Sequence, residues 1–360
     1  TYFPFQMIYT MKSKKIYIPK GSNNMNIIVD AFGGDNAPLE VIKGAAEAVE
    51  KLDVDITLTG NESIIKKTAE ENNISLNRIS IIHTESVIDI HEEPTEVIKG
   101  KSDCSMAVGL KALSEGKGDA FVSAGSTGAL VVGATFIAKR IKGIKRAVLA
   151  PILPTAKGHV MLVDGGANVD CRPEMLLQFG IMGSCYMERV MGIKSPKVGL
   201  LNVGAEDTKG RDMDIEAYKL LKNSPVDFYG NLEARELPFG ECQVAVSDGF
   251  TGNIALKLYE GMGSFFAKEL KNMLSGGLGG KLAALLILPK IKEFKKKFDY
   301  KEVGGAVLMG ISRPVIKAHG SSDAKAFYNA IRQAKNCVDG KVIEAVTQSI
   351  EKVKAEAENK

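Results

Sequence analysis

Five short turns combine glycine with small polar residues, and each directly follows an apolar run. They cover residues 30–35, 123–129, 164–170, 247–253 and 318–323. Glycine lets the backbone approach a ligand closely, and the N–H groups that begin a helix attract anions. Such residues also make tight strand–helix connections without any ligand. Five of these turns in one chain nevertheless favour a single anion site assembled from distant loops.

The donors in these turns decide which chemistry they allow. Backbone N–H groups, small hydroxyls and amides suit either a tetrahedral anion such as phosphate or the oxyanion of an acyl transfer. We therefore expect phosphate or substrate to contact residues of several turns. The candidate binding residues are Gly33, Gly34, Asp35, Ser123, Gly125, Ser126, Thr127, Gly128, Asn168, Asp248, Gly249, Thr251, Gly252, Gly320, Ser321 and Ser322.

Four polar residues are candidates for catalysis. Lys209 lies in a further glycine-flanked loop, and Lys317 and His319 stand beside Gly320. The lysines can balance the charge of phosphate, Asn253 can donate to an oxyanion, and His319 can pass a proton to a leaving thiolate. A solvated surface lysine and a structural histidine are the alternatives for Lys209 and His319. No protein nucleophile is required, because bound phosphate can itself attack a thioester.

The sequence motifs of nucleotide-binding proteins and of hydrolases with a serine nucleophile are incomplete or absent in this chain. Gly100-Lys101-Ser102 resembles the end of a P-loop, but Thr95 stands where the first glycine belongs. No G-x-G-x-x-G follows the first expected strand, and no G-x-S-x-G occurs. These failures argue against a P-loop protein, a dinucleotide-binding enzyme and an α/β-hydrolase.

Composition narrows the classes further. The net charge of +4 is too mild to indicate a nucleic-acid partner. The five cysteines form no C-x-x-C, and the four histidines form no H-E-x-x-H. We therefore expect reduced thiols in a cytoplasmic protein, no metal site and no cofactor.

Apolar runs of strand length alternate with helical patterns, which predicts an α/β fold with a mostly parallel sheet covered on both faces. No linker divides residues 25–360, so we expect one domain with an inserted helical arm. Strands are expected at Ile27–Val29, Ile56–Thr59, Ile79–Ile82, Ala120–Ser123, Ala147–Leu153, Val160–Val163, Lys197–Leu201, Asp227–Gly230 and Val244–Val246. Helices are expected at Pro38–Lys51, Glu62–Asn72, Glu93–Gly100, Ser105–Glu115, Gly128–Arg140, Pro173–Met191, Met213–Asn223, Gly252–Leu274 and Asp323–Val338.

Residues 1–24 differ from the rest of the chain. They carry four lysines among scattered aromatic residues, without the apolar core of a signal peptide. Met25 opens a clean strand pattern, so we interpret it as the native start and residues 1–24 as an upstream extension, non-native or disordered. A basic membrane arm is the alternative.

The expected arm covers residues 270–301. An apolar run flanked by glycine pairs, too short to span a bilayer, is followed by closely spaced lysines. This pattern favours contact with an anionic membrane surface, or a dimer-interface or core helix. The candidate membrane residues are Leu282, Leu285, Leu286, Leu288, Lys290, Lys292, Lys295 and Lys296.

Six segments, in order between Met25 and about Val338, together resemble the bacterial phosphate acyltransferase family. Each segment alone would be a weak signal, whereas the ordered set is specific. The segments are Asp30-Ala31-Phe32-Gly33-Gly34-Asp35, Ser123-Ala124-Gly125-Ser126-Thr127-Gly128-Ala129, Ala167-Asn168-Val169-Asp170, Gly199-Leu200-Leu201-Asn202-Val203-Gly204, Asp248-Gly249-Phe250-Thr251-Gly252-Asn253 and Pro314-Val315-Ile316-Lys317-Ala318-His319-Gly320-Ser321-Ser322-Asp323.

The resemblance implies an α/β/α sandwich like the isocitrate/isopropylmalate dehydrogenases and the phosphotransacetylases. It implies reversible transfer of a long-chain fatty acyl group from acyl carrier protein to inorganic phosphate. A membrane glycerol-phosphate acyltransferase would then use the acyl-phosphate for phospholipid biosynthesis. It also implies a homodimer associated peripherally with the inner face of the cell membrane. The chain departs from the family at Ser126, where Asn is usual, and at Gly165, where an apolar residue is usual.

Two alternative functions remain open. A short-chain phosphotransacetylase acting on acyl-CoA would share the fold and the phosphate site. A non-catalytic membrane scaffold would bind liposomes without phosphate-dependent loss of a thioester. The docking surface for a carrier protein should be basic, because such carriers are acidic, and its candidate residues are Arg140, Lys142, Lys145 and Arg146.

Overall fold

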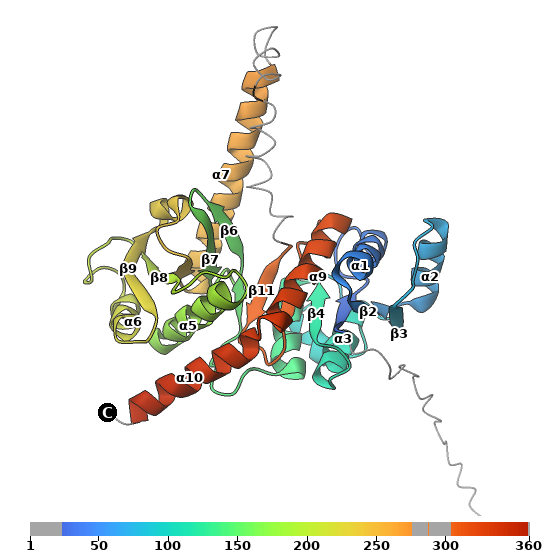
Figure 1. Ribbon diagram of the computed structural model, residues 1–360, viewed down its shortest axis with the longest axis horizontal. Helices are drawn as coiled ribbons and strands as arrows, with labels where there is room; N and C mark the ends of the chain where they lie inside the picture. Colours follow the sequence, from blue (N-terminus) through green and yellow to red (C-terminus); the bar gives the residue numbers. More distant parts are fainter. Residues whose placement is uncertain (1–23, 276–286, 288–303, 359–360) are drawn as a thin grey trace, which may run out of the picture.

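The computed structural model describes residues 24–275, 287 and 304–358. Within these residues the strands form two sheets, which occupy the two halves of the molecule in Figure 1. In the chain, the whole second sheet lies between two strands of the first. The second half is therefore an insertion into the first.

The first sheet is parallel through most of its width. Its strands are β1 (Asn26–Asp30), β2 (Asp55–Gly60), β3 (Ile79–His83), β4 (Ala120–Ser123), β5 (Val148–Ala150), β11 (Ala306–Met309) and β12 (Val315–Lys317). They lie in the order β3-β2-β1-β4-β12-β11-β5. The first five in this order are parallel, and β11 pairs antiparallel with both β12 and β5.

The second sheet begins where the first ends. Its strands are β6 (Ile152–Thr155), β7 (Gly158–Val163), β8 (Lys197–Asn202), β9 (Asp227–Glu233) and β10 (Val244–Val246), in the order β6-β7-β10-β8-β9. Only the β6–β7 pair among these described strands is antiparallel. The expected strand Ala147–Leu153 is thus two strands in two sheets, separated by Pro151, whose nitrogen cannot donate to a ladder. The expectation of a single sheet is therefore wrong, because the described strands form two sheets.

Nine α-helices lie in the described residues, and the last two follow the final strand. They are α1 (Leu39–Leu52), α2 (Glu62–Glu71), α3 (Ser105–Ser114), α4 (Thr127–Gly133), α5 (Pro173–Arg189), α6 (Asp212–Lys222), α7 (Gly249–Ser275), α9 (Ala324–Asp339) and α10 (Val342–Glu358). Shorter 3-10 turns cover Pro94–Ile98 and Ala234–Phe239, and a π-helical turn covers Ala134–Ala138.

Alternate residues of β1 show how helices cover both faces of the first sheet. Ile27 and Val29 are fully buried in the cluster that includes α1 and α9, whereas Ile28 is buried in the cluster that includes α3. Successive side chains of a strand point to opposite faces, so the sheet lies between two helical layers. The larger cluster also contains Val163 of β7 and Phe179 of α5, and therefore spans both sheets.

Helix α7 projects from the body of the molecule (Figure 1). No helix in the described residues is long and apolar enough to cross a membrane. The candidate membrane residues Leu282, Leu285, Leu286, Leu288, Lys290, Lys292, Lys295 and Lys296 lie outside the described residues, as does most of the expected arm.

Candidate active site

The first two glycine turns fold onto one another at the carboxyl ends of β1 and β4. The Ser123 hydroxyl donates to Asp30 Oδ2 at 2.8 Å and accepts from the Gly125 N–H at 3.0 Å. A Cβ at Gly33 would lie 2.7 Å from both Asp30 Oδ2 and the Gly125 nitrogen, so a side chain has no room there. Burial raises the pKa of Asp30, despite hydroxyl donors that include Ser123.

Lys317 ends β12 and pairs in register with Ser123 of β4. Its Nζ donates to the Ala124 carbonyl at 3.2 Å. Burial lowers the pKa of Lys317 to about 8, against the attraction of Asp35 and Asp30. An ammonium with such a pKa changes charge just above neutral pH, which is unusual for lysine.

The fifth turn, residues 318–323, joins this first cluster. The Asp35 N–H donates to the Gly320 carbonyl at 2.8 Å. His319 Nδ1 accepts from the Ser321 N–H at 3.2 Å and lies 2.8 Å from the Ser321 hydroxyl. A neutral His319 ring therefore carries its proton on Nε2. The buried Ser322 hydroxyl has no hydrogen-bond partner among the described residues.

The third turn, which follows β7, is folded around one buried carboxylate. Asp164 accepts the N–H groups of Gly166, Ala167 and Asn168 at 2.7–3.1 Å. It also accepts the N–H of Leu149, the middle residue of β5, at 3.1 Å. Burial raises the pKa of Asp164 even with these donors. The carboxylate thus shapes the turn and attaches it to the edge of the first sheet.

Asn168 also has a structural role in this turn. Its Nδ2 donates to the Ala147 carbonyl and to Asp164 Oδ2, both at 2.8 Å. Its carbonyl accepts the Gly249 N–H at 2.7 Å, and a Cβ at Gly249 would lie 2.6 Å from that oxygen. The third and fourth turns therefore pack directly against each other.

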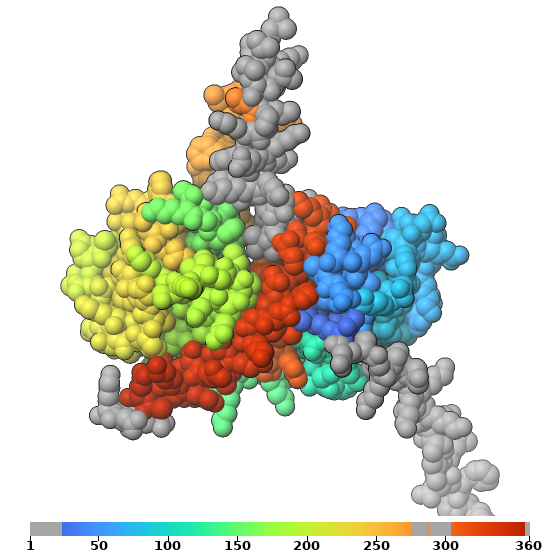
Figure 2. All heavy atoms as spheres, in the orientation of Figure 1, coloured from blue at the N-terminus to red at the C-terminus, as the bar shows by residue number. Residues whose placement is uncertain are grey.

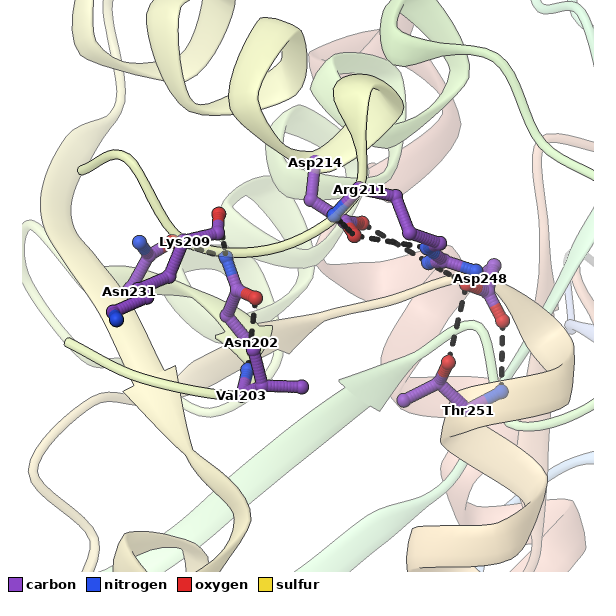
Figure 3. Close-up of polar contacts among 8 residues, drawn as sticks. All are labelled: Asn202, Val203, Lys209, Arg211, Asp214, Asn231, Asp248 and Thr251. Atoms are coloured by element: carbon purple, nitrogen blue, oxygen red, sulfur yellow. Dashed lines mark hydrogen bonds and ion pairs between the residues drawn. The ribbon is translucent and has the colours of Figure 1, made fainter. Parts of the chain in front are cut away.

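The fourth turn contains an ion pair between a buried carboxylate and an exposed guanidinium, which Figure 3 shows. Asp248 accepts the Thr251 N–H at 2.7 Å and the Thr251 hydroxyl at 3.1 Å, and it pairs with Arg211. Burial alone would raise the pKa of Asp248, but the Thr251 N–H and the Arg211 guanidinium hold it below its usual range. Arg211 also pairs with Asp214 at 2.9 Å, in the first turn of α6.

Lys209 lies two residues before Arg211 on the same loop, and it is exposed. Its carbonyl accepts the Asn202 amide at 3.0 Å, and the same amide reaches Asn231 Oδ1 at 3.1 Å. In Figure 3 Lys209 lies beside Asn231, whereas the Arg211 side chain extends toward Asp248. The loop thus presents two exposed cations near the end of β8, of which Arg211 is paired with Asp248.

Asn253 lies in the second turn of α7, directly after Gly252. A Cβ at Gly252 would lie 1.9 Å from the Asp164 carbonyl oxygen, so glycine lets the helix approach the third turn. Asn253 is exposed, and its Nδ2 donates to the Gly165 carbonyl at 3.1 Å. The amide thus stands beside the third turn, at the positive end of a long helix.

Hydrogen bonds join the candidate residues into two groups, one at the end of each sheet. Asp30, Ser123 and Lys317 gather at the first sheet, whereas Asp164 and Asp248 gather at the second. Strands β11 and β5 lie between β12 and the third turn. Separately, the Ser126 hydroxyl caps α4 by accepting the Ala129 N–H at 3.4 Å.

Sequence reasoning missed three residues that organise these clusters. Asp30 is the last residue of β1 and Asp164 directly follows β7, so each begins a glycine turn, which is a recognisable position for a carboxylate that folds the turn. Arg211 follows Gly210 closely, but no spacing rule connects it with Asp248. Among the described residues, no three His, Cys, Asp or Glu side chains gather as metal ligands would.

Comparisons with known proteins agree with this architecture. Residues 25–345 match the family model described as fatty acid synthesis protein. Phosphate acyltransferases of Clostridium botulinum (strain Loch Maree / Type A3) and Anoxybacillus flavithermus are 49% and 47% identical, covering 91% and 92% of this chain and 98% and 100% of theirs. In these comparisons the relatives match nearly end to end.

Solved structures of lower identity share the fold. A phosphotransacetylase from Streptococcus pyogenes is 19% identical with a TM-score of 0.59, and the EutD phosphotransacetylase from Staphylococcus aureus is 16% identical with a TM-score of 0.58. Each alignment covers 89% of this chain and 94% of the other. The predicted α/β/α class, mostly parallel and phosphotransacetylase-like, is confirmed.

Proposed function

The chain belongs to the phosphate acyltransferase family of fatty acid synthesis proteins, and on that premise we propose that it transfers a long-chain fatty acyl group from acyl carrier protein to inorganic phosphate. The acyl-phosphate product then serves a membrane glycerol-phosphate acyltransferase in phospholipid synthesis. The observation that carries the proposal is the exposed Asn253 amide beside the third turn, with the cationic loop of Lys209 and Arg211 nearby at Asp248.

The reaction needs one attack and one departure. An oxygen of hydrogen phosphate attacks the thioester carbonyl, the carbon–oxygen bond forms, and the carbon–sulfur bond breaks. The proton of hydrogen phosphate ends on the leaving thiolate, so atoms and charge balance. We assign Lys209 to charge balance and the Asn253 amide to the oxyanion. Lys317 is a second cation for phosphate, and His319 is the candidate proton carrier.

The raised pKa of the cysteine next to the site supports direct attack by phosphate rather than by a protein thiolate. Cys171 lies on the loop after Asn168, and its Sγ is 3.6 Å from the Asn168 carbonyl. Burial, together with the charges of Asp164 and Asp248, raises the pKa of Cys171 to about 11. At neutral pH the group is a thiol, which is a poor nucleophile. A covalent acyl-enzyme on this residue is therefore disfavoured.

The direct test is incubation of the protein with palmitoyl-acyl carrier protein and labelled phosphate. The expected result is labelled acyl-phosphate together with free carrier thiol, in equal amounts. A parallel reaction contains acetyl-CoA as the donor. Faster turnover of acetyl-CoA would instead assign a short-chain phosphotransacetylase. Membrane binding without phosphate-dependent loss of either thioester would assign a scaffold.

The pKa of Lys317 predicts the pH dependence of phosphate use. Below about pH 8 the partly buried ammonium is charged and attracts phosphate, and above it the neutral amine does not. The kcat/KM for phosphate is therefore expected to fall above pH 8, approaching tenfold per pH unit at about one unit beyond. Lys317→Arg keeps its charge to much higher pH, so its profile should stay level. A wild-type profile level to pH 9.5 would contradict this role.

We also propose peripheral contact with the inner face of the cell membrane, and a homodimer. Helix α7 carries exposed apolar side chains, including Phe265 at 53% and Phe266 at 60% exposure. Such side chains favour burial in a lipid or protein surface. The expected result is liposome co-sedimentation that weakens when Leu285 and Leu286 are both replaced by Glu. Unchanged sedimentation would remove that segment from membrane binding.

A further inference from the structure

A groove of about 410 Å³ lies between residues 143–145, α5 and α10. Figure 2 shows α10, in red, lying against α5, in yellow-green. The groove has an apolar lining within a polar border. The apolar residues are Ile144, Leu177, Ile181, Ile350 and Val353.

Five cations lie in or beside this groove: Lys145 and Lys354 line it, and the other three belong to the chain segment on either side of residues 143–145. All five are exposed, and none forms an ion pair with a carboxylate among the residues that the structure describes. Glu174 is the acidic residue in the lining. The border therefore carries an excess of positive charge that its own protein leaves unneutralised. The cations are Arg140, Lys142, Lys145, Arg146 and Lys354.

The loop that bears most of these cations has a preformed shape. Gln178 of α5 accepts the Lys145 N–H at 2.8 Å and donates to the Gly143 carbonyl at 2.9 Å. Gly143 has a φ of +94°, and a Cβ there would lie 2.3 Å from Lys354 Nζ. A preformed surface loses less conformational entropy when a partner binds.

The walls of the groove continue into the candidate site. Beyond the cationic loop, the Ala147 carbonyl accepts from Asn168, and the Leu149 N–H donates to Asp164. Helix α5 begins at Pro173, directly after the third turn. Arg146 also lies close enough to Cys171 to lower the thiol pKa, against the larger effects of burial and the two site aspartates. A molecule seated in the groove is thus adjacent to the third turn.

Resting on the proposed function, we infer that this groove docks an acidic, amphipathic helix of the acyl carrier protein. Unneutralised cations complement acidic side chains, and the apolar lining receives the apolar face of the helix. Adjacency to the third turn lets the tethered thioester enter the site. The groove itself would carry specificity for the carrier, whereas the turns would carry the chemistry.

The test compares charge reversals inside and outside the groove. Lys142→Glu/Lys145→Glu reverses the loop, and Lys354→Glu reverses the α10 side. Lys66→Glu/Lys67→Glu, on exposed α2 at the far end of the first sheet, is the charge-matched control. Each is assayed with palmitoyl-acyl carrier protein and with palmitoyl-pantetheine, a neutral donor without a protein. Binding of the unacylated carrier is measured separately by calorimetry.

The groove variants are expected to raise KM for the acylated carrier about tenfold or more, with a weaker dependence on salt. Their kinetics with palmitoyl-pantetheine should match wild type, as should both activities of the α2 control. An unchanged KM and affinity for the carrier would overturn the docking proposal. So would a groove variant that loses its oligomeric state, because the groove would then be a contact between copies.

The binding measurement separates failure of docking from failure of the proposed function. If wild-type protein binds the carrier through the groove but forms no acyl-phosphate, the docking inference stands and the proposed reaction fails. If acyl-phosphate forms equally well with all variants, the reaction stands and the docking inference fails.

Discussion

Replacing Asn253 by Ala is expected to lower turnover of palmitoyl-acyl carrier protein at least ~100-fold, the scale of removing one oxyanion donor. The side chain is exposed, and its amide is aimed by a single hydrogen bond of 3.1 Å to the Gly165 carbonyl. Alanine removes the donor without adding volume, and it is well tolerated inside a helix. The loss should therefore appear in kcat, measured at saturating phosphate, while circular dichroism and the unfolding midpoint stay close to wild type.

The matched control for this variant is Lys257→Ala, one turn further along α7. Lys257 is exposed and pairs with Glu260 at 2.8 Å, so its loss should leave kcat unchanged. Lys209→Ala is expected to lose turnover on the same scale as the Asn253 variant, because phosphate loses a charge partner. Near-normal rates in folded Asn253→Ala or Lys209→Ala protein would remove that residue from the catalytic assignment.

Replacing Asp164 by Ala is expected to destabilise the protein by about 3–5 kcal/mol, the range for breaking a buried charged network. The carboxylate accepts four backbone N–H groups and the Asn168 amide. Alanine would leave these donors without their acceptor in a partly buried turn, each at a cost of about 1 kcal/mol or more. The measurement is the free energy of unfolding from urea denaturation followed by far-ultraviolet circular dichroism.

Asp170→Ala controls for the loss of an acidic residue in the same turn. Asp170 is exposed, so its removal should change the free energy of unfolding by less than about 0.5 kcal/mol. Equal stability of the Asp164→Ala and Asp170→Ala proteins would show that the turn does not depend on its buried carboxylate.

Much of the fold could be predicted from local patterns, and the exceptions have physical causes. The expected strands match β1 to β10, apart from the division at Pro151. The structure adds β11 and β12, which the prediction lacked. Each is short and pairs with the other, but their remaining partners, β5 and β4, lie far away in the chain, so pairing rather than local sequence defines them. Helix α10 was also missed, although its Val342, Val346 and Ile350 repeat at helical spacing and are buried.

The candidate site was less predictable than the fold. Glycine at position 252 is explained by a contact with the Asp164 carbonyl, which lies in another turn. The partner of Asp248 is Arg211, 37 positions earlier. Composition and spacing identify turns that can bind an anion. They do not show which polar groups already form hydrogen bonds within the protein. Asn168 and Thr251 show this, since their donors serve Asp164 and Asp248.

The insertion of the second sheet between β5 and β11 has a consequence for biosynthesis. A ribosome makes β4 long before β12, the strand that lies beside it in the finished sheet. Until then, the nascent chain holds β4 with one edge of unpaired N–H and C=O groups, an arrangement that invites aggregation. The half that contains the first sheet is begun first and completed last, because β11 and β12 are synthesised after the whole second sheet.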